Sequence, residues 1–345
     1  MIRPDDMEHC REAIRHGSLS FHAASKLLPA NVRDPALALY AFCRLADDEV
    51  DLKQDKVASV LRLRDRLDQV YAGRPKDAPT DRAFAAIVED FEMPRALPDA
   101  LLEGLAWDAD ERRYATLSGV KSYSARVASA VGAMMCVLMR VRDADALARA
   151  CDLGVAMQLT NIARDVGEDA AERRIYLPLD WLEAAGIEPE AFFADPRPNK
   201  AVRSMVRRLV MEANRLYIRS EAGIGALPVA CRPGIFAARF IYAGIGRQLT
   251  GMGYDSISAR ARTSKVQKIG WLGGSMLRAA GSLVMPRNPV IYAQPLEEVA
   301  FLVEATAQGA PQRSRSDALI SVLSTLEAQA RAQRAELTGH RPSAT

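Results

Sequence analysis

The chain has 345 residues, of which 49% are hydrophobic, and its formal charge is +3. This apolar, nearly neutral composition, without a long basic run, favours a large core and excludes a protein that binds nucleic acid by neutralising phosphates. The five cysteines are scattered and form no C-x-x-C pattern, which argues for a reducing compartment and against a disulfide framework or a structural zinc site.

The N-terminal part of the chain predicts helices and no leader peptide. Residues 1–17 contain no apolar stretch of signal-peptide length, so a cytoplasmic protein is expected. Pro35 suits the first turn of a helix that runs through Asp51, and Pro98 suits the start of another. Between these starts, apolar residues at helical spacing predict a helix over residues 57–71.

An acidic pattern ends the first of these helices. Asp47 and Asp51 stand four residues apart, so both carboxylates project from one helical face. Arg44 precedes Asp47 by three residues on roughly the same face. Two like charges there are unfavourable unless something binds them. Taken alone, the pattern is also typical of a solvated acidic face.

A second acidic pattern follows an apolar run. Residues 127–139 are uncharged but too few to span a bilayer, and they predict a buried helix. Farther on, Asn161, Asp165 and Asp169 repeat every four residues, with Gln158 and Arg164 beside them. These are oxygen ligands on one stripe of a helix whose other positions are apolar. An exposed stripe of ion pairs is the alternative interpretation. An EF-hand calcium site is excluded, because neither acidic segment has the EF-hand loop pattern.

The two acidic patterns together predict a metal-assisted diphosphate site. Mg²⁺ takes oxygen ligands and is usually held by a few carboxylates, waters and substrate phosphates, with Mn²⁺ as an alternative ion. Two such helices facing each other across a bundle would hold Mg²⁺ ions that bridge a diphosphate, and the neighbouring arginines would complete the anion site.

The remainder of the chain continues the helical pattern. Apolar residues over 202–216 form one helical stripe, and no run of alternating β-branched residues is present anywhere. We therefore expect an all-α, single-domain bundle of ten or more helices over residues 1–310. Residues 311–345 are polar and predict a C-terminal helix or tail that is partly disordered.

Several segments resemble the squalene/phytoene synthase family. Besides the two acidic motifs, the similar segments are GSLSF at 17–21, ASKLLP at 24–29, Tyr123 with VASAVG at 127–132, and RRIYLP at 173–178. The resemblance runs from about residue 8 to 285, in the order expected for the family. The phytoene-forming bacterial members are the most similar.

The resemblance implies an isoprenoid-synthase bundle with a central apolar cavity and the acidic motifs at its mouth. It implies a transferase that condenses two geranylgeranyl diphosphates head to head (1-1') to phytoene through prephytoene diphosphate, the first committed step of carotenoid biosynthesis. No NADPH is expected. The alternatives are a squalene or dehydrosqualene synthase that uses farnesyl diphosphate, a terpene cyclase, and a non-catalytic helical scaffold protein.

The resemblance also assigns roles to individual residues. Asp47, Asp51, Asp165 and Asp169 would bind Mg²⁺–diphosphate, assisted by Asn161. Contacts with the substrate diphosphates or the reacting carbons fall on Ser18, Ser20, Phe21, Tyr40, Arg44, Tyr123, Gln158, Arg164 and Tyr242. A basic stretch either closes over the diphosphate or forms a solvated face, and it comprises Arg260, Arg262, Lys265 and Lys268.

The implied partners follow from the substrate class. The expected partners are a prenyl diphosphate and downstream carotenoid enzymes. No nucleic-acid partner is expected. The apolar stretch over 269–285 contains Trp271 and is interrupted only by Arg278. Such a stretch suits a helix on a membrane surface, which would place the protein on the inner face of the cytoplasmic membrane. An ordinary core-facing helix is the alternative.

Overall fold

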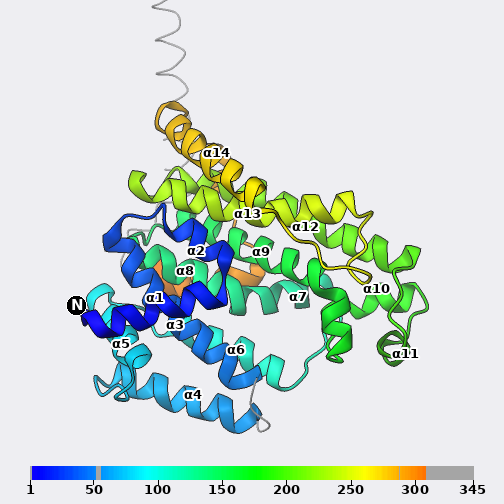
Figure 1. Cartoon of the computed structure of the whole chain (residues 1–345), viewed down its shortest axis with the longest axis horizontal. Coiled ribbons are helices and arrows are strands. Elements are labelled where there is room, and N and C mark those ends of the chain that lie inside the picture. Colours follow the sequence, from blue (N-terminus) through cyan, green and yellow to red (C-terminus); the bar gives the residue numbers. More distant parts are fainter. Residues whose placement is uncertain (1, 52–55, 287, 308–345) are drawn as a thin grey trace, which may run out of the picture.

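The computed structural model describes residues 2–51, 56–286 and 288–307, and every regular element in these ranges is a helix (Figure 1). The predicted C-terminal tail, residues 311–345, lies outside them. The helices of the first part are α1 (Pro4–Gly17), α2 (Leu19–Ser25), α3 (Ala30–Asp51), α4 (Lys56–Tyr71), α5 (Pro79–Phe91), α6 (Ala96–Ala109), α7 (Leu117–Ser124), the π-helical η1 (Ala125–Ser129) and α8 (Ala130–Leu138).

The second part contains the longest helices of the described chain. It comprises α9 (Ala144–Ala171), α10 (Leu179–Ala184), α11 (Pro189–Ala194), α12 (Lys200–Ile224), the 3₁₀ turn η2 (Val229–Cys231), α13 (Arg232–Gly251), α14 (Lys265–Val284), the 3₁₀ turns η3 (Pro289–Tyr292) and η4 (Glu297–Val299), and α15 (Ala300–Ala307).

The predicted helices are confirmed, with one boundary corrected. Pro98 lies in the first turn of α6, as expected. Helix α3 begins at Ala30 instead of Pro35, so Pro35 lies inside it. The Pro29 carbonyl starts this helix early by accepting hydrogen bonds from the amides of Val32 and Arg33, at 3.0 and 2.8 Å. The helix is therefore already under way when it reaches Pro35, which lies in its second turn.

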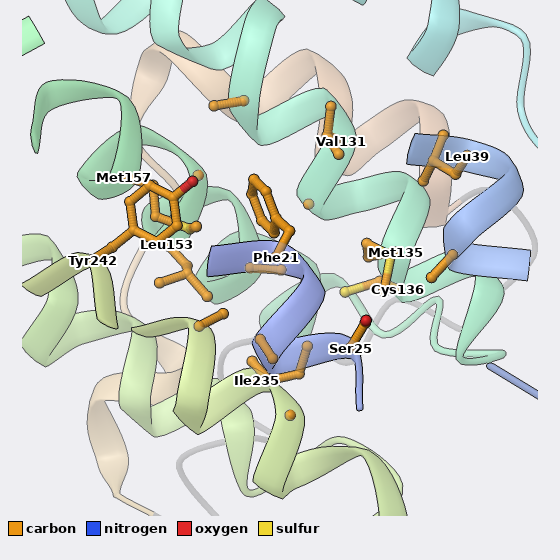
Figure 2. A pocket seen from close by; sticks show the side chains of 18 of the residues that line it. Phe21, Ser25, Leu39, Val131, Met135, Cys136, Leu153, Met157, Ile235 and Tyr242 are labelled. Carbon is orange, nitrogen blue, oxygen red and sulfur yellow. The ribbon is translucent and has the colours of Figure 1, made fainter. Parts of the chain in front are cut away.

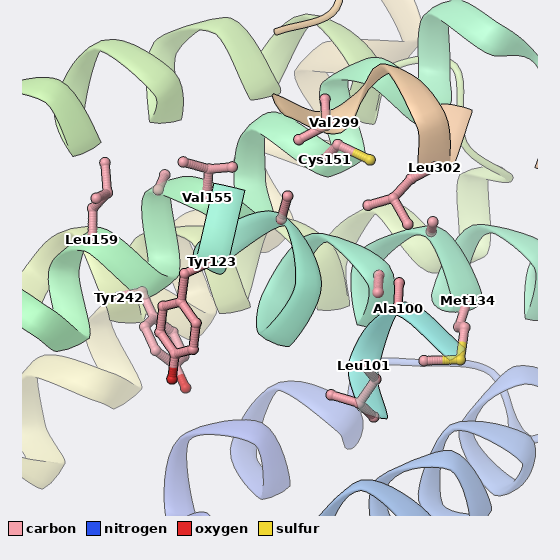
Figure 3. Close-up of a cluster of buried hydrophobic side chains, with 14 of the residues drawn as sticks. Ala100, Leu101, Tyr123, Met134, Cys151, Val155, Leu159, Tyr242, Val299 and Leu302 are labelled. Atoms are coloured by element: carbon pink, nitrogen blue, oxygen red, sulfur yellow. The ribbon is translucent and has the colours of Figure 1, made fainter. Parts of the chain in front are cut away.

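Helix α9 occupies the centre of the bundle and packs against α7, α8, α12, α13 and α15. Its buried apolar residues contact layers from both ends of the chain, and Figure 3 shows Val155 and Leu159 of α9 in a cluster that also holds Leu101 of α6 and Leu302 of α15. Each such side chain contributes roughly 1.5–3 kcal/mol on burial. The second acidic pattern therefore lies on the most enclosed helix of the fold.

The uncharged run at 127–139 is buried as predicted, but part of it is π-helical. Gly154 of α9 lies so close to η1 that a Cβ there would be 2.6 Å from Ser129 Cα. The Ser129 hydroxyl donates a 2.7 Å hydrogen bond to the Cys151 carbonyl. This close approach fixes η1 against the helix that carries the second acidic pattern.

A buried ion pair holds the segment after α14 on the bundle. Arg149 and Asp152 are fully buried, with 2.8 Å between Nε and Oδ2, and Arg219 approaches the same oxygen at 3.1 Å. Arg149 also donates to the carbonyls of Val290 and Gln294, at 2.7 and 3.3 Å. No helix in the described ranges is long and apolar enough to cross a membrane.

Candidate active site

The first acidic motif lies at the C-terminal end of α3. Arg44 contacts two of its carboxylates, with Nη1 3.5 Å from Asp47 Oδ2 and Nη2 2.6 Å from Asp48 Oδ1. These three side chains are each about half exposed. Asp51 ends the helix, and its side chain lies outside the described part of the structure. The predicted pairing of Arg44 with this motif is thus observed for Asp47, while the place of the Asp51 carboxylate stays a prediction.

The second motif lies in the last turns of α9 and is neutralised by arginines. The Arg164 guanidinium donates two hydrogen bonds to the Asp165 carboxylate, of 2.7 and 2.6 Å. Arg260, from the loop before α14, reaches the same carboxylate at 2.9 Å and Glu168 at 3.0 Å. Two guanidinium groups therefore converge on Asp165. Arg260 belongs to the basic stretch for which the sequence left open closure over the diphosphate or a solvated face, and this residue contacts the acidic motif directly.

Asp169 occupies an electrostatically unfavourable position. Burial, together with the charges of Asp165 and Glu172, raises its pKa from 3.8 to about 8, and the charge of Arg174 opposes this shift. A divalent cation beside this group would favour the ionised form. The position is therefore chemically suited to a metal ion.

The pKa of Asp169 makes a prediction about stability. Because this pKa is higher in the folded than in the unfolded chain, folding takes up a proton between pH 4 and about 8, and stability falls as the pH rises through that range. We expect Asp169→Asn, without metal, to flatten this dependence and to raise the free energy of unfolding at pH 8 by on the order of 3 kcal/mol. Urea unfolding of both proteins between pH 5 and pH 8 measures the difference. Parallel profiles would contradict the assignment.

A cavity of about 320 Å³ opens beside these motifs (Figure 2). Its walls are apolar and come from α2, α3, η1, α8, α9, α12 and α13. Tyr40, Gln158 and Asn161 add polar groups to the lining. The Asn161 Oδ1 atom is buried and has no hydrogen-bond partner among the described residues, although its amide nitrogen lies 3.4 Å from Gln158 Oε1. A buried unpaired oxygen costs on the order of 1–3 kcal/mol, so this one is suited to a cation or donor supplied by a ligand.

Aromatic rings border the same cavity. The ring centroid of Phe21 is 6.3 Å from that of Tyr40 and 5.5 Å from that of Tyr242. Burial raises the pKa of Tyr40 and raises that of Tyr242 to about 12. Both phenols are therefore neutral at physiological pH. A Cβ at Gly17 would lie 2.1 Å from Tyr40 Oη, so glycine at the end of α1 permits the position of this hydroxyl.

Four other predicted residues lie apart from this lining. Ser18 caps α2, its Oγ accepting a 3.3 Å hydrogen bond from the Phe21 amide. Ser20 lies on α2 and is partly exposed, and Lys265 is exposed at the first turn of α14. Tyr123 is buried and does not line the cavity. Their substrate contacts remain predictions.

Tyr123 belongs instead to a polar network that sequence reasoning missed. The hydroxyls of Tyr123 and Tyr176 donate to the two oxygens of Asp108, at 2.8 and 2.7 Å. The two rings stack with centroids 5.1 Å apart. The charge of Asp108 also raises the pKa of Asp169. Asp108 comes from α6 and has no regular spacing to either acidic motif, so only Tyr176, in the segment 173–178, carried a signal.

The metal site as a whole is not assembled in the described residues. Within these ranges, no three Asp, Glu, His or Cys side chains are grouped so that they could hold a metal ion. The structure brings Phe21, Tyr40, Gln158, Asn161 and Tyr242 to one cavity, and Asp165 to Arg164 and Arg260. The meeting of the two acidic motifs on shared ions stays a prediction.

Comparisons with known proteins identify the architecture and then the family. A dehydrosqualene synthase crystallised with a ligand superposes with a TM-score of 0.75 at 29% identity, over 80% of this chain and 97% of that one. The fold is therefore the all-α isoprenoid-synthase bundle, as predicted. The squalene/phytoene synthase family model matches residues 14–267.

Two phytoene synthases are similar to this chain along nearly its whole length. Phytoene synthase of Cereibacter sphaeroides is 61% identical over 351 residues, covering 99% of each chain. Phytoene synthase of Rhodobacter capsulatus is 59% identical over 334 residues, covering 96% of this chain and 98% of that protein. The chain belongs to the squalene/phytoene synthase family, which confirms the resemblance.

Proposed function

We propose that this chain condenses two geranylgeranyl diphosphates head to head to phytoene, and so commits isoprenoids to carotenoid biosynthesis. The observation that carries the proposal is the pairing of an apolar cavity with an arginine-bound acidic motif, in a chain 61% identical to a phytoene synthase along its length. An apolar cavity suits a prenyl chain, and the charged groups suit its diphosphate.

The charged groups would hold and release the diphosphate. We assign Mg²⁺, or alternatively Mn²⁺, to Asp47, Asp51, Asn161, Asp165 and Asp169. When bound, the ion neutralises charge on the departing diphosphate. The unpaired Asn161 Oδ1 and the raised pKa of Asp169 support this ligand set.

The arginines would bind the same anion. Arg164 and Arg260 have planar guanidinium groups that match phosphate oxygens with paired hydrogen bonds. Both now share Asp165, so they already lie at the acidic motif where the diphosphate would arrive. Arg44 is placed in the same way at the first motif. These arginines would stabilise the negative charge that grows as the carbon–oxygen bond breaks.

The cavity would protect the reacting carbons. Ionisation of one substrate releases diphosphate and gives an allylic cation. The C2–C3 double bond of the second substrate attacks this cation, and loss of a proton closes the cyclopropane ring of prephytoene diphosphate. A second ionisation, rearrangement and proton loss give phytoene. Apolar walls keep water from quenching these cations, and the faces of Phe21, Tyr40 and Tyr242 are suited to stabilise them.

Chain length separates this proposal from its nearest alternative. The structural similarity to a dehydrosqualene synthase favours farnesyl diphosphate as the second candidate substrate. The test supplies the purified chain with Mg²⁺ and either the C20 or the C15 diphosphate, without NADPH, and identifies the hydrocarbon by mass. A C40 product is expected, and a C30 product with no C40 product would favour the alternative. Absence of both would favour a scaffold role.

We propose a cytoplasmic location. All five cysteines are free, and four of them are buried, which suits a reducing compartment. Exchange of the product with downstream carotenoid enzymes is part of the same proposal, because phytoene is a hydrocarbon that does not dissolve in water.

A further inference from the structure

The loop between α13 and α14, residues 252–264, docks on the last turns of α9 at Gly167. The Gly167 amide donates a 3.1 Å hydrogen bond to the Ser256 carbonyl of this loop. A Cβ on Gly167 would lie 2.8 Å from Ile257 Cα and 2.9 Å from the Ser256 oxygen. Both of these are backbone atoms, so the loop could not keep its place beside a larger residue.

The helix itself does not require glycine at position 167. Gly167 lies inside the 28-residue α9, and its φ is outside the left-handed region. Glycine in a helix interior is less favourable than alanine, because it loses more conformational freedom on folding. The missing side chain therefore serves the contact with the loop and not the helix.

Two further features fix the same loop. Asp255 accepts hydrogen bonds from two amides of the turn that follows it, at 3.1 and 2.9 Å. Arg203 of α12 forms a 2.8 Å ion pair with Asp255. Farther along the loop, Ala261 is only 3% exposed. The backbone is therefore anchored both before and after Arg260.

Arg260 reaches α9 on either side of the docking point. Its Nε lies 2.9 Å from Asp165 Oδ1, and its Nη1 lies 3.0 Å from Glu168 Oε2. Gly167 stands between these two acidic residues in the sequence. How closely the loop approaches α9 thus determines where the guanidinium group lies. An outward shift of about 1 Å would take these contacts beyond good hydrogen-bonding distance.

We propose that Gly167 is a positioning residue for diphosphate binding, because it lets the loop dock directly on α9 and so holds Arg260 at the acidic motif. The inference rests on the proposed function, in which Arg260 binds the diphosphate. With its backbone already fixed, the Arg260 side chain has only to exchange carboxylate for phosphate oxygens, and little conformational entropy is lost on binding. Gly167 itself touches no substrate and acts through Arg260.

Binding of inorganic diphosphate with Mg²⁺ to the full-length chain tests the proposal without turnover. Gly167→Ala should raise the Kd measured by calorimetry at least about tenfold, because it moves a charged donor away from the anion. Arg260→Gln should raise it to a similar extent. Adding Gly167→Ala to Arg260→Gln should then change the Kd less than about twofold. Helix content should stay that of the wild type, since alanine favours a helix.

The matched control is Gly273→Ala on α14, where an added Cβ would meet no neighbouring group of the described residues within 4 Å. Its Kd should equal that of the wild type. Trypsin gives a second readout, because cleavage after Arg260 requires the loop to leave the surface. This cleavage should be at least about fivefold faster in Gly167→Ala and unchanged in the control. Arg203→Ala frees the other anchor and should give the same two effects if Gly167→Ala folds poorly.

The proposal is overturned if the wild type does not bind diphosphate, if Gly167→Ala binds and is cleaved like the wild type, or if the control is affected equally. A double variant that binds much more weakly than Arg260→Gln would also overturn it, since Gly167 would then act by another route. A wild type that binds diphosphate but forms no C40 hydrocarbon would refute the proposed reaction and leave this inference in place.

Discussion

Replacing Asp165 with alanine is expected to lower turnover at least about a thousandfold while leaving the helix content unchanged. Asp165 is the carboxylate on which Arg164 and Arg260 converge, and it lies one turn from both Asn161 and Asp169 on α9. Its loss removes a proposed metal ligand and the group that holds both arginines in position. Steady-state turnover with Mg²⁺ and circular dichroism together measure the two expectations.

The matched control is Glu168→Gln on the same helix. Glu168 is half exposed and contacts Arg260, but it lies off the stripe formed by Asn161, Asp165 and Asp169. Turnover of this variant should stay within about fivefold of the wild type, because it removes only an exposed ion pair. A second readout is the rise in melting temperature caused by Mg²⁺ with inorganic diphosphate. It should be present in the control and lost in Asp165→Ala. Near-normal turnover in Asp165→Ala would refute the metal assignment.

The second large effect is expected in the cavity. Met135 of α8 lines the cavity, and Figure 2 shows it with Cys136 on the opposite side from Tyr242 and Met157. Because Tyr242 lies near the charged mouth, we place Met135 near the far end. Met135→Trp should fill space that a C20 chain needs and a C15 chain does not. The ratio of C20 to C15 turnover should fall at least about tenfold.

Overpacking can also destabilise the fold, so this prediction needs a comparison. Met211→Trp on α12 makes the same exchange at a side chain that is 58% exposed, and its turnover ratio should match the wild type. Val131→Phe, one turn earlier on α8, provides a second obstruction if the first variant folds poorly. An unchanged ratio of C20 to C15 turnover in both cavity variants would show that this end of the cavity does not determine which substrate chain length is accepted.

The fold could be predicted well because its signals are local. Apolar spacing marked α4 and α12, and an uncharged run marked α8. Four-residue spacing placed Asn161, Asp165 and Asp169 on one stripe of α9. The start of α3 could not be read in this way, since the helix begins at the hydrogen bonds to the Pro29 carbonyl and not at Pro35. The close packing of the π-helical turn η1 against Gly154, a residue distant in sequence, could not be read from local patterns either.

The site was predictable only where its residues are neighbours in sequence. The link between Arg44 and Asp47 follows from three-residue spacing on a helix. The network of Asp108 with Tyr123 and Tyr176 joins three segments that meet only after folding. In the same way, nothing in the local pattern tells that Arg260 contacts Asp165 across the bundle. Long-range contacts of this kind require the structure.

The most direct test of the proposed reaction supplies only geranylgeranyl diphosphate and Mg²⁺ and measures the amounts of hydrocarbon and of inorganic diphosphate that form. Head-to-head condensation predicts a C40 hydrocarbon with two inorganic diphosphates released for each molecule formed, and neither product in the presence of EDTA. A cyclic C20 hydrocarbon with one diphosphate for each molecule would contradict the account, and so would a chain that releases no diphosphate from this substrate.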